Sequence, residues 1–134
     1  MRNGLKVGAT GEQRFVVEPA HTIDLAEGSV PPVLSTPWLI WFLEHAARAA
    51  VLPFLEEGEC TVGSHVDVDH LAATPVGQRV TCVARVVHME GRLISFQLEA
   101  RDESELIARG FHRRRVILAN RFARRLEAKT HPPA

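Results

Sequence analysis

Hydrophobic and polar positions change their spacing along the chain, and each change marks a different predicted element. Residues 13–17 alternate as in a β-strand, and Pro19 ends this pattern. We expect an extended segment over 21–25 and a loop over 26–36, where glycine and proline gather. The first part of the chain is therefore predicted to be one strand followed by a long connection.

The clearest signal is the apolar segment PWLIWFLEHAARAAVLPFL. It predicts a helix from Pro37 to about Leu55, with Thr36 as the N-cap and Pro37 in the first turn, where a missing N–H is harmless. A kink is expected at Pro53, because proline removes a backbone donor. The helix is apolar on nearly every side, and such helices are normally buried.

After a turn at 56–59, apolar positions recur at every second residue. Val66, Val68 and His70 share one face of a strand, which is expected to point inward. The opposite face carries His65, Asp67 and Asp69. Further strands are expected at 79–88, 93–101 and 105–116, and a basic helix at 120–129.

This order predicts a single α+β domain over residues 1–134, in which an antiparallel sheet wraps around one long central helix. One small sheet cannot cover a helix that is apolar all round. A second copy that extends the sheet edge to edge would help to cover it and would remove an exposed edge strand. We therefore expect a homodimer.

Composition narrows the class of protein. Apolar residues make up 46% and charged residues 24% of 134, as in an ordinary soluble globular domain. We find no export signal and no apolar run of about 20 residues, so no membrane partner is expected. Cys60 and Cys82 lie in apolar contexts, which favours free thiols and a cytoplasmic location. His65, Asp67 and Asp69 lack further ligand spacing, so no metal site is predicted.

The formal net charge is zero, but the charges are unevenly placed. From Arg109 onward there are eight basic residues against a single acidic one, Glu127. Such a region attracts anions, and the candidates are nucleic acid and a phosphorylated group such as coenzyme A. The alternative interpretation is a solvated surface without a ligand.

The predicted order of elements is that of the hotdog fold. The segments VLSTPWLIWFLEHAA and VGSHVDVDHLAATPVGQRVT resemble the bacterial fluoroacetyl-CoA thioesterase family of the thioesterase superfamily. In that family a threonine begins the central helix, a glutamate lies eight positions later, and a histidine precedes Ala-Ala-Thr-Pro. The matching residues are Thr36, Glu44 and His70. The resemblance implies catalytic roles for them in hydrolysis of a short acyl-CoA thioester, with coenzyme A as part of the substrate and no separate cofactor.

The departures from the family pattern concern the acyl group. Pro37 stands where a small residue is expected, and Trp38 and Trp41 are expected to narrow the pocket. The bulky side chains of Trp38, Trp41 and Phe42 favour a small acyl group, and a fluoroacetyl preference does not follow from the resemblance.

The residues themselves leave alternatives open. A carboxylate inside an apolar helix is costly unless it is paired, so Glu44 is either a nucleophile or base, or a partner of Arg48 one turn away. His70 suits general acid–base chemistry, or is a core histidine bonded to a carbonyl. Thr36 is a supporting hydroxyl or only a cap. Eight helical residues span about 12 Å, so either the substrate runs between Thr36 and Glu44, or the site combines residues across a dimer interface, which we favour.

Substrate-binding candidates follow from the same arrangement. The N–H groups of Trp38 and Leu39 are oxyanion donors at the start of the helix, and Gly63 allows close backbone approach. The candidates for the phosphates of coenzyme A are arginines of the basic region: Arg113, Arg114, Arg115 and Arg121. The alternative function is a non-catalytic acyl-CoA-binding protein, which needs no Glu44. A nucleic-acid binder ranks third.

Overall fold

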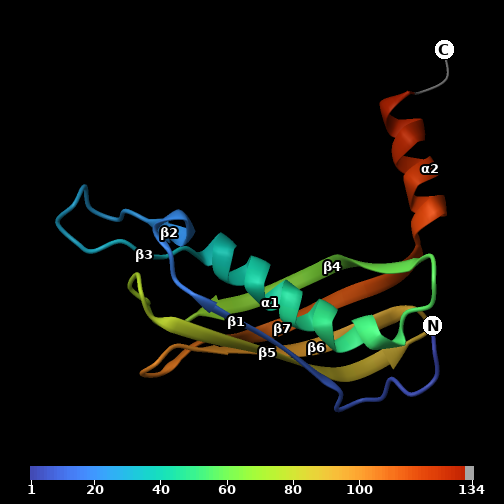
Figure 1. Ribbon diagram of the computed structural model, residues 1–134, viewed down its shortest axis with the longest axis horizontal. Helices are drawn as coiled ribbons and strands as arrows, with labels where there is room; N and C mark the ends of the chain where they lie inside the picture. The colour runs from blue at the N-terminus through green and yellow to red at the C-terminus, as the bar shows by residue number, and fades with distance from the viewer. Residues whose placement is uncertain (132–134) are drawn as a thin grey trace.

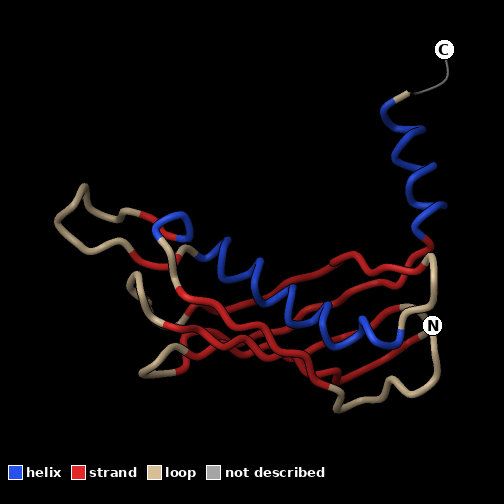
Figure 2. The backbone as a smooth tube through the Cα atoms, viewed as in Figure 1, coloured by secondary structure: helices blue, strands red, loops and turns tan. Residues whose placement is uncertain are grey.

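A five-stranded antiparallel sheet curls around one helix in the computed structural model, which describes residues 1–131 (Figures 1 and 2). The strand order is β1-β5-β6-β7-β4, and the helix α1 spans Thr36–Val51. The strands are β1 (Thr10–Val16), β4 (Glu59–His70), β5 (Arg79–Glu90), β6 (Leu93–Arg101) and β7 (Leu106–Leu118). The predicted α+β arrangement is confirmed, and the last three residues of the predicted domain lie outside the described part.

Short elements fill the connection between β1 and α1. A 3₁₀ turn at Pro19–His21 leads into β2 (Thr22–Ile23), which pairs with β3 (Val33–Leu34) as a small separate sheet. The sequence predicted an extended segment over 21–25 and an uninterrupted loop over 26–36, so β3 was missed. The Leu34 N–H donates to the carbonyl of Thr74, which ties β3 to the segment between β4 and β5 just before α1 begins.

The ends of α1 differ from the prediction, and the difference at its start affects the site. Ser35 has the extended backbone of an N-cap, whereas Thr36 is already helical, so the assignment of Thr36 as the cap was wrong. The helix ends at Val51 and is followed by a 3₁₀ turn at Leu52–Phe54. Pro53 therefore ends the helix instead of kinking it, because it has no N–H to continue the backbone ladder.

One side of α1 is buried and the other is exposed within a single chain. The buried side packs on the sheet and consists of Leu39, Phe42, Leu43, Ala46, Ala47, Ala50 and Val51. Trp38 and Trp41 lie on the other side, 37% and 44% exposed. The expectation of a helix buried on every side is therefore wrong for one chain.

The two edges of the sheet are unequal. β1 is a short edge of 7 residues, packed closely under α1, where Gly11 lets the helix backbone approach. β4 is an edge of 12 residues, with a bulge between Gly63 and His65. Figure 1 shows the last helix, α2 (Ala119–Thr130), projecting past the β4 edge. None of the described helices is long and apolar enough to cross a membrane.

Candidate active site

Thr36 and His70 meet where α1 begins and β4 ends. The Thr36 hydroxyl oxygen lies 2.7 Å from Nδ1 of His70, a short hydrogen bond. Because Ser35 takes the cap position, the Thr36 side chain remains free for this contact. His70 is the last residue of β4, and alternation along the strand turns it to the same face as Val66 and Val68. The structure thus brings together two of the three residues predicted to be catalytic.

A cavity of about 400 Å³ opens beside this pair. Its polar lining comes from Ser35, Thr36 and His70, and its other lining residues are mostly apolar: Ile23, Leu25, Val33, Leu34, Pro37, Leu71, Ala72 and Ala73. Nε2 of His70 is buried and has no hydrogen-bond partner among the described residues. An apolar pocket with a few convergent polar groups is typical of a small-molecule site.

Burial lowers the pKa of His70 below its usual value, and the backbone of Ala72 opposes this shift more weakly. His70 is therefore neutral at pH 7. A neutral imidazole has one donor and one acceptor nitrogen, so Nδ1 bonded to Thr36 leaves Nε2 to exchange a proton with a bound molecule.

Glu44 lies apart from this pair, two turns further along α1. Its Oε1 is 4.0 Å from the Arg114 guanidinium and 3.9 Å from Nε2 of His112. Its side chain is 33% exposed. It also lies against Gly63 in β4, where an added Cβ would stand 2.7 Å from Oε1. The predicted pair with Arg48 is not among the ion pairs of the described residues.

Arg114 is fixed by a buried network. It donates to the Thr61 hydroxyl at 2.9 Å and to the Thr61 carbonyl at 3.0 Å. Nδ1 of His112 donates to the His65 carbonyl at 2.7 Å, so Nε2 is the acceptor that faces Arg114 at 3.2 Å. Burial lowers the pKa of His112, which keeps it neutral. Arg114 is thus the cation that faces Glu44.

Sequence reasoning missed this network. Arg114 was expected to contact coenzyme A phosphates, but it is 6% exposed and points inward. The signal was present: His112, Arg114 and Val116 alternate in β7 and so share the inward face. A buried arginine and a half-buried glutamate each need a partner, which would have linked them.

The remaining predicted residues lie in three places. Trp38 lies on the exposed side of α1 beside Trp41, outside the cavity lining. Leu39 is a core residue whose N–H donates to the Ser35 carbonyl at 3.0 Å, so it is not a free oxyanion donor. The other three are arginines at the surface: Arg113 and Arg115 on the outer face of β7, and Arg121 on α2. Among the described residues, no three potential metal ligands gather.

Comparisons with known proteins identify the family. The model of the family described as a fluoroacetyl-CoA-specific thioesterase matches residues 17–120. A fluoroacetyl-CoA thioesterase of Streptantibioticus cattleyicolor is 35% identical over 138 residues, which is 97% of this chain and 98% of the relative. The chain belongs to the fluoroacetyl-CoA-specific thioesterase family.

Solved structures agree with this assignment. A fluoroacetyl-CoA thioesterase superposes with a TM-score of 0.87 at 34% identity, covering 95% of this chain and 98% of that one. A thioesterase superfamily member from Thermus thermophilus gives a TM-score of 0.86 at 34% identity, covering 98% and 99%. The hotdog fold and the class of enzyme predicted from the sequence, a thioester hydrolase, are confirmed, and the non-catalytic alternative is not supported.

Proposed function

We propose that this thioesterase hydrolyses small acyl-CoA thioesters, and that the acyl group enters the cavity beside Thr36 and His70. The hydrogen bond between these two side chains carries the proposal, because it orients a half-buried neutral imidazole whose Nε2 has no hydrogen-bond partner within residues 1–131. Relatives support the choice of substrate: a variant of the fluoroacetyl-CoA thioesterase was solved with acetyl-CoA, and another with fluoroacetate and CoA. Fluoroacetyl-CoA and acetyl-CoA are therefore the first esters to test.

The proposed site combines two copies of the chain. Within one chain, Glu44 lies about 12 Å along α1 from Thr36, and a helix cannot shorten that separation. The 12-residue edge strand β4 is suited to pair with its counterpart across a two-fold axis. A homodimer of this kind brings the Glu44 of each chain toward the other chain's Thr36 and His70.

In the proposed reaction, Glu44 acts as the base that takes a proton from water, or as the nucleophile itself. Attack on the thioester carbonyl forms a tetrahedral intermediate, and the Trp38 N–H, in the first turn of α1, is suited to stabilise its oxyanion. When Glu44 acts as the base, the C–S bond then breaks, and the proton that Glu44 took from water passes through Nε2 of His70 to the leaving sulfur. When Glu44 acts as the nucleophile, coenzyme A leaves as a thiolate, and water then hydrolyses the Glu44 anhydride, which regenerates the carboxylate and supplies the proton that His70 passes to the thiolate. Thr36 keeps the imidazole oriented through its bond to Nδ1.

Release of free thiol from acyl-CoAs of different length tests the activity, with His70→Ala and Glu44→Gln as variants. We expect turnover of a small ester and losses of several orders of magnitude in both variants, with the fold intact by circular dichroism. A Glu44→Gln protein with near wild-type kcat would remove Glu44 from the mechanism.

Mixing the two inactive variants tests the shared site. If Glu44 acts on the partner's His70, a random mixture of His70→Ala and Glu44→Gln chains regains about a quarter of wild-type activity, because each mixed dimer contains one complete site. If each chain held its own site, the mixture would stay inactive. A protein that sediments as a monomer at micromolar concentration would also refute the dimer.

A cytoplasmic location is part of the proposal. Cys60 and Cys82 are free, and burial raises the pKa of the Cys82 thiol to about 12, so that thiol is unreactive. Free thiols fit a reducing compartment.

A further inference from the structure

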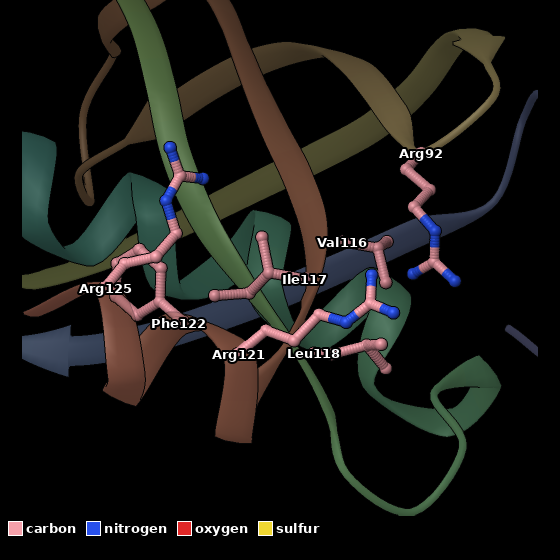
Figure 3. A pocket seen from close by; sticks show the side chains of 7 residues that line it. All are labelled: Arg92, Val116, Ile117, Leu118, Arg121, Phe122 and Arg125. Atoms are coloured by element: carbon pink, nitrogen blue, oxygen red, sulfur yellow. The ribbon is translucent and has the colours of Figure 1, made fainter.

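A second cavity lies at the base of α2, far from the Thr36–His70 pair of the same chain. It measures about 230 Å³, and Figure 3 shows its lining: Arg92, Val116, Ile117, Leu118, Arg121, Phe122 and Arg125. Three arginines and four apolar side chains thus line it. The Phe122 ring is 37% exposed. We call this the α2 pocket.

The α2 pocket carries excess positive charge. Arg92 lies 3.1 Å from Glu59, but the same carboxylate also binds the N-terminal ammonium at 3.0 Å. Arg121 and Arg125 are in no ion pair within residues 1–131. Glu59 is thus the sole acidic partner for these cations among the described residues, which leaves a site suited to several phosphate charges.

The chemistry of the pocket fits a nucleotide bearing phosphates. Guanidinium groups bind phosphate through paired hydrogen bonds, and aromatic rings and arginine planes stack on bases. The 3′-phosphorylated ADP portion of coenzyme A supplies both features, whereas the acyl and pantetheine portions supply neither. A simple anion would not need the Phe122 ring.

The sheet register places the α2 pocket at the Glu59 end of β4, opposite to the His70 end where the same chain's Thr36–His70 pair lies. Leu118, just before α2, pairs with Glu59, whereas His70 pairs with Ala108. Eleven strand residues separate Glu59 from His70, which is about 36 Å. An antiparallel pairing of β4 with the partner's β4 brings the His70 end of one strand beside the Glu59 end of the other. Figure 1 shows that α2 projects past this edge, toward the side where a partner would lie.

We propose that the α2 pocket of each chain, with Arg121, Arg125 and Phe122, binds the nucleotide portion of the acyl-CoA whose acyl group occupies the partner chain's Thr36–His70 site. This inference rests on the proposed thioesterase function and its dimer. In this proposal, α2 of one chain raises the affinity of the other chain's site for coenzyme A. It takes no part in breaking the C–S bond.

The first experiment separates nucleotide binding from chemistry. The double variant Arg121→Gln/Arg125→Gln is compared with Arg124→Gln/Lys129→Gln, which removes the same charge from the same helix outside the pocket lining. We expect KM for fluoroacetyl-CoA to rise about tenfold or more only in the first variant, with kcat unchanged. KM for fluoroacetyl-pantetheine, which lacks the nucleotide, should not change in either.

Calorimetry with free coenzyme A gives a readout that needs no turnover. The Arg121→Gln/Arg125→Gln protein should bind coenzyme A about tenfold more weakly or worse, while the control pair binds as wild type. Equal weakening in both pairs, or an equal rise in KM for the pantetheine ester, would overturn the assignment. If wild type binds coenzyme A but hydrolyses no ester, the thioesterase function fails and the α2 pocket does not.

A mixture of chains tests the action in trans. His70→Ala chains, which keep α2, are added in excess to chains that keep His70 but carry Arg121→Gln/Arg125→Gln. In the mixed dimers, every intact His70 faces an intact α2 pocket, so KM for fluoroacetyl-CoA should return to the wild-type value. A KM that stays high would place the nucleotide on the same chain as the acyl group and refute the proposal.

Discussion

The contact between Gly63 and Glu44 yields a quantitative prediction, because a single methyl group added there displaces a carboxylate. A Cβ at position 63 would lie 2.7 Å from Oε1 of Glu44, and ordinary contact begins near 3.4 Å. The carboxylate must therefore withdraw by roughly 0.7 Å. The next neighbour, Cε1 of His112 at 3.3 Å, needs to give only slightly.

The cost to folding should be small and the cost to catalysis large. The Glu44 side chain is 33% exposed and can rotate, which costs about 1 kcal/mol for an off-rotamer conformation. In contrast, a displacement near 1 Å in a catalytic group can slow a reaction about a hundredfold. We therefore expect Gly63→Ala to lower kcat by roughly 30- to 100-fold, or about 2–3 kcal/mol of transition-state stabilisation.

Gly110→Ala is a control of the opposite kind. A Cβ at position 110 would overlap the Asp67 carbonyl oxygen and stand 2.8 Å from Cα of Val68, so backbone atoms of β4 and β7 must separate. We expect a loss of about 1–3 kcal/mol in the free energy of unfolding. Thiol release and urea unfolding, measured on both variants, distinguish the two effects. A folded Gly63→Ala protein with wild-type kcat would refute the view that Glu44 must hold this position.

Three further predictions concern the residues around the site. Arg114→Met should lower the free energy of unfolding by about 2–3 kcal/mol in urea titrations, because it removes the buried cation that faces Glu44. Arg113→Met, at the surface, should leave the free energy of unfolding nearly unchanged. Thr36→Ser should keep most of the turnover, and Thr36→Val should lower kcat about tenfold or more, because only serine keeps a hydroxyl that can bond Nδ1 of His70. Equal values of kcat in the two variants would show that the hydroxyl has no role in turnover. The free energy of unfolding should fall as pH drops below about 6.5, since the lowered pKa values of His70 and His112 mean that the unfolded chain binds more protons than the folded one. Urea unfolding at pH 7.5 and 5.5 should show this loss of stability, and His112→Gln should reduce it. A loss that is the same in His112→Gln as in wild type would contradict this reasoning.

The period of the apolar positions was enough to predict the fold. Alternation around Val66, Val68 and His70 correctly placed an inward face on β4, and the uninterrupted apolar run correctly placed α1 at the centre. The error at the start of α1 lies where two neighbouring residues have equal capping ability. Ser35 and Thr36 are both good N-caps, and only the path of β3 into the helix decides between them.

The site was less predictable, because its contacts join segments distant in sequence. The resemblance indicated Thr36, Glu44 and His70, and helix geometry separated Thr36 from Glu44. The sequence did not show that Thr36 contacts His70 or that Glu44 faces Arg114. Strand alternation shows which face His112 and Arg114 share, but not which side chain of α1 they meet. That information lies in the pairing of β4 with β7 and in how α1 crosses them.

In the proposed dimer, the separation of Glu44 from the Thr36–His70 pair gives the long edge strand β4 a role in the chemistry. Thr36 and Glu44 both lie on α1, and a helix is too stiff to bring positions about 12 Å apart to one carbonyl. Loop closure cannot solve this, since Glu44 is held from behind by Arg114 and packed against Gly63. In the proposed dimer, a two-fold axis at β4 would bring the middle of one α1 toward the start of the other without any movement of a loop. The distance between Glu44 of one chain and His70 of the other would then depend on the register of the two paired β4 strands. Backbone hydrogen bonds between strands would fix that distance more firmly than a loop could.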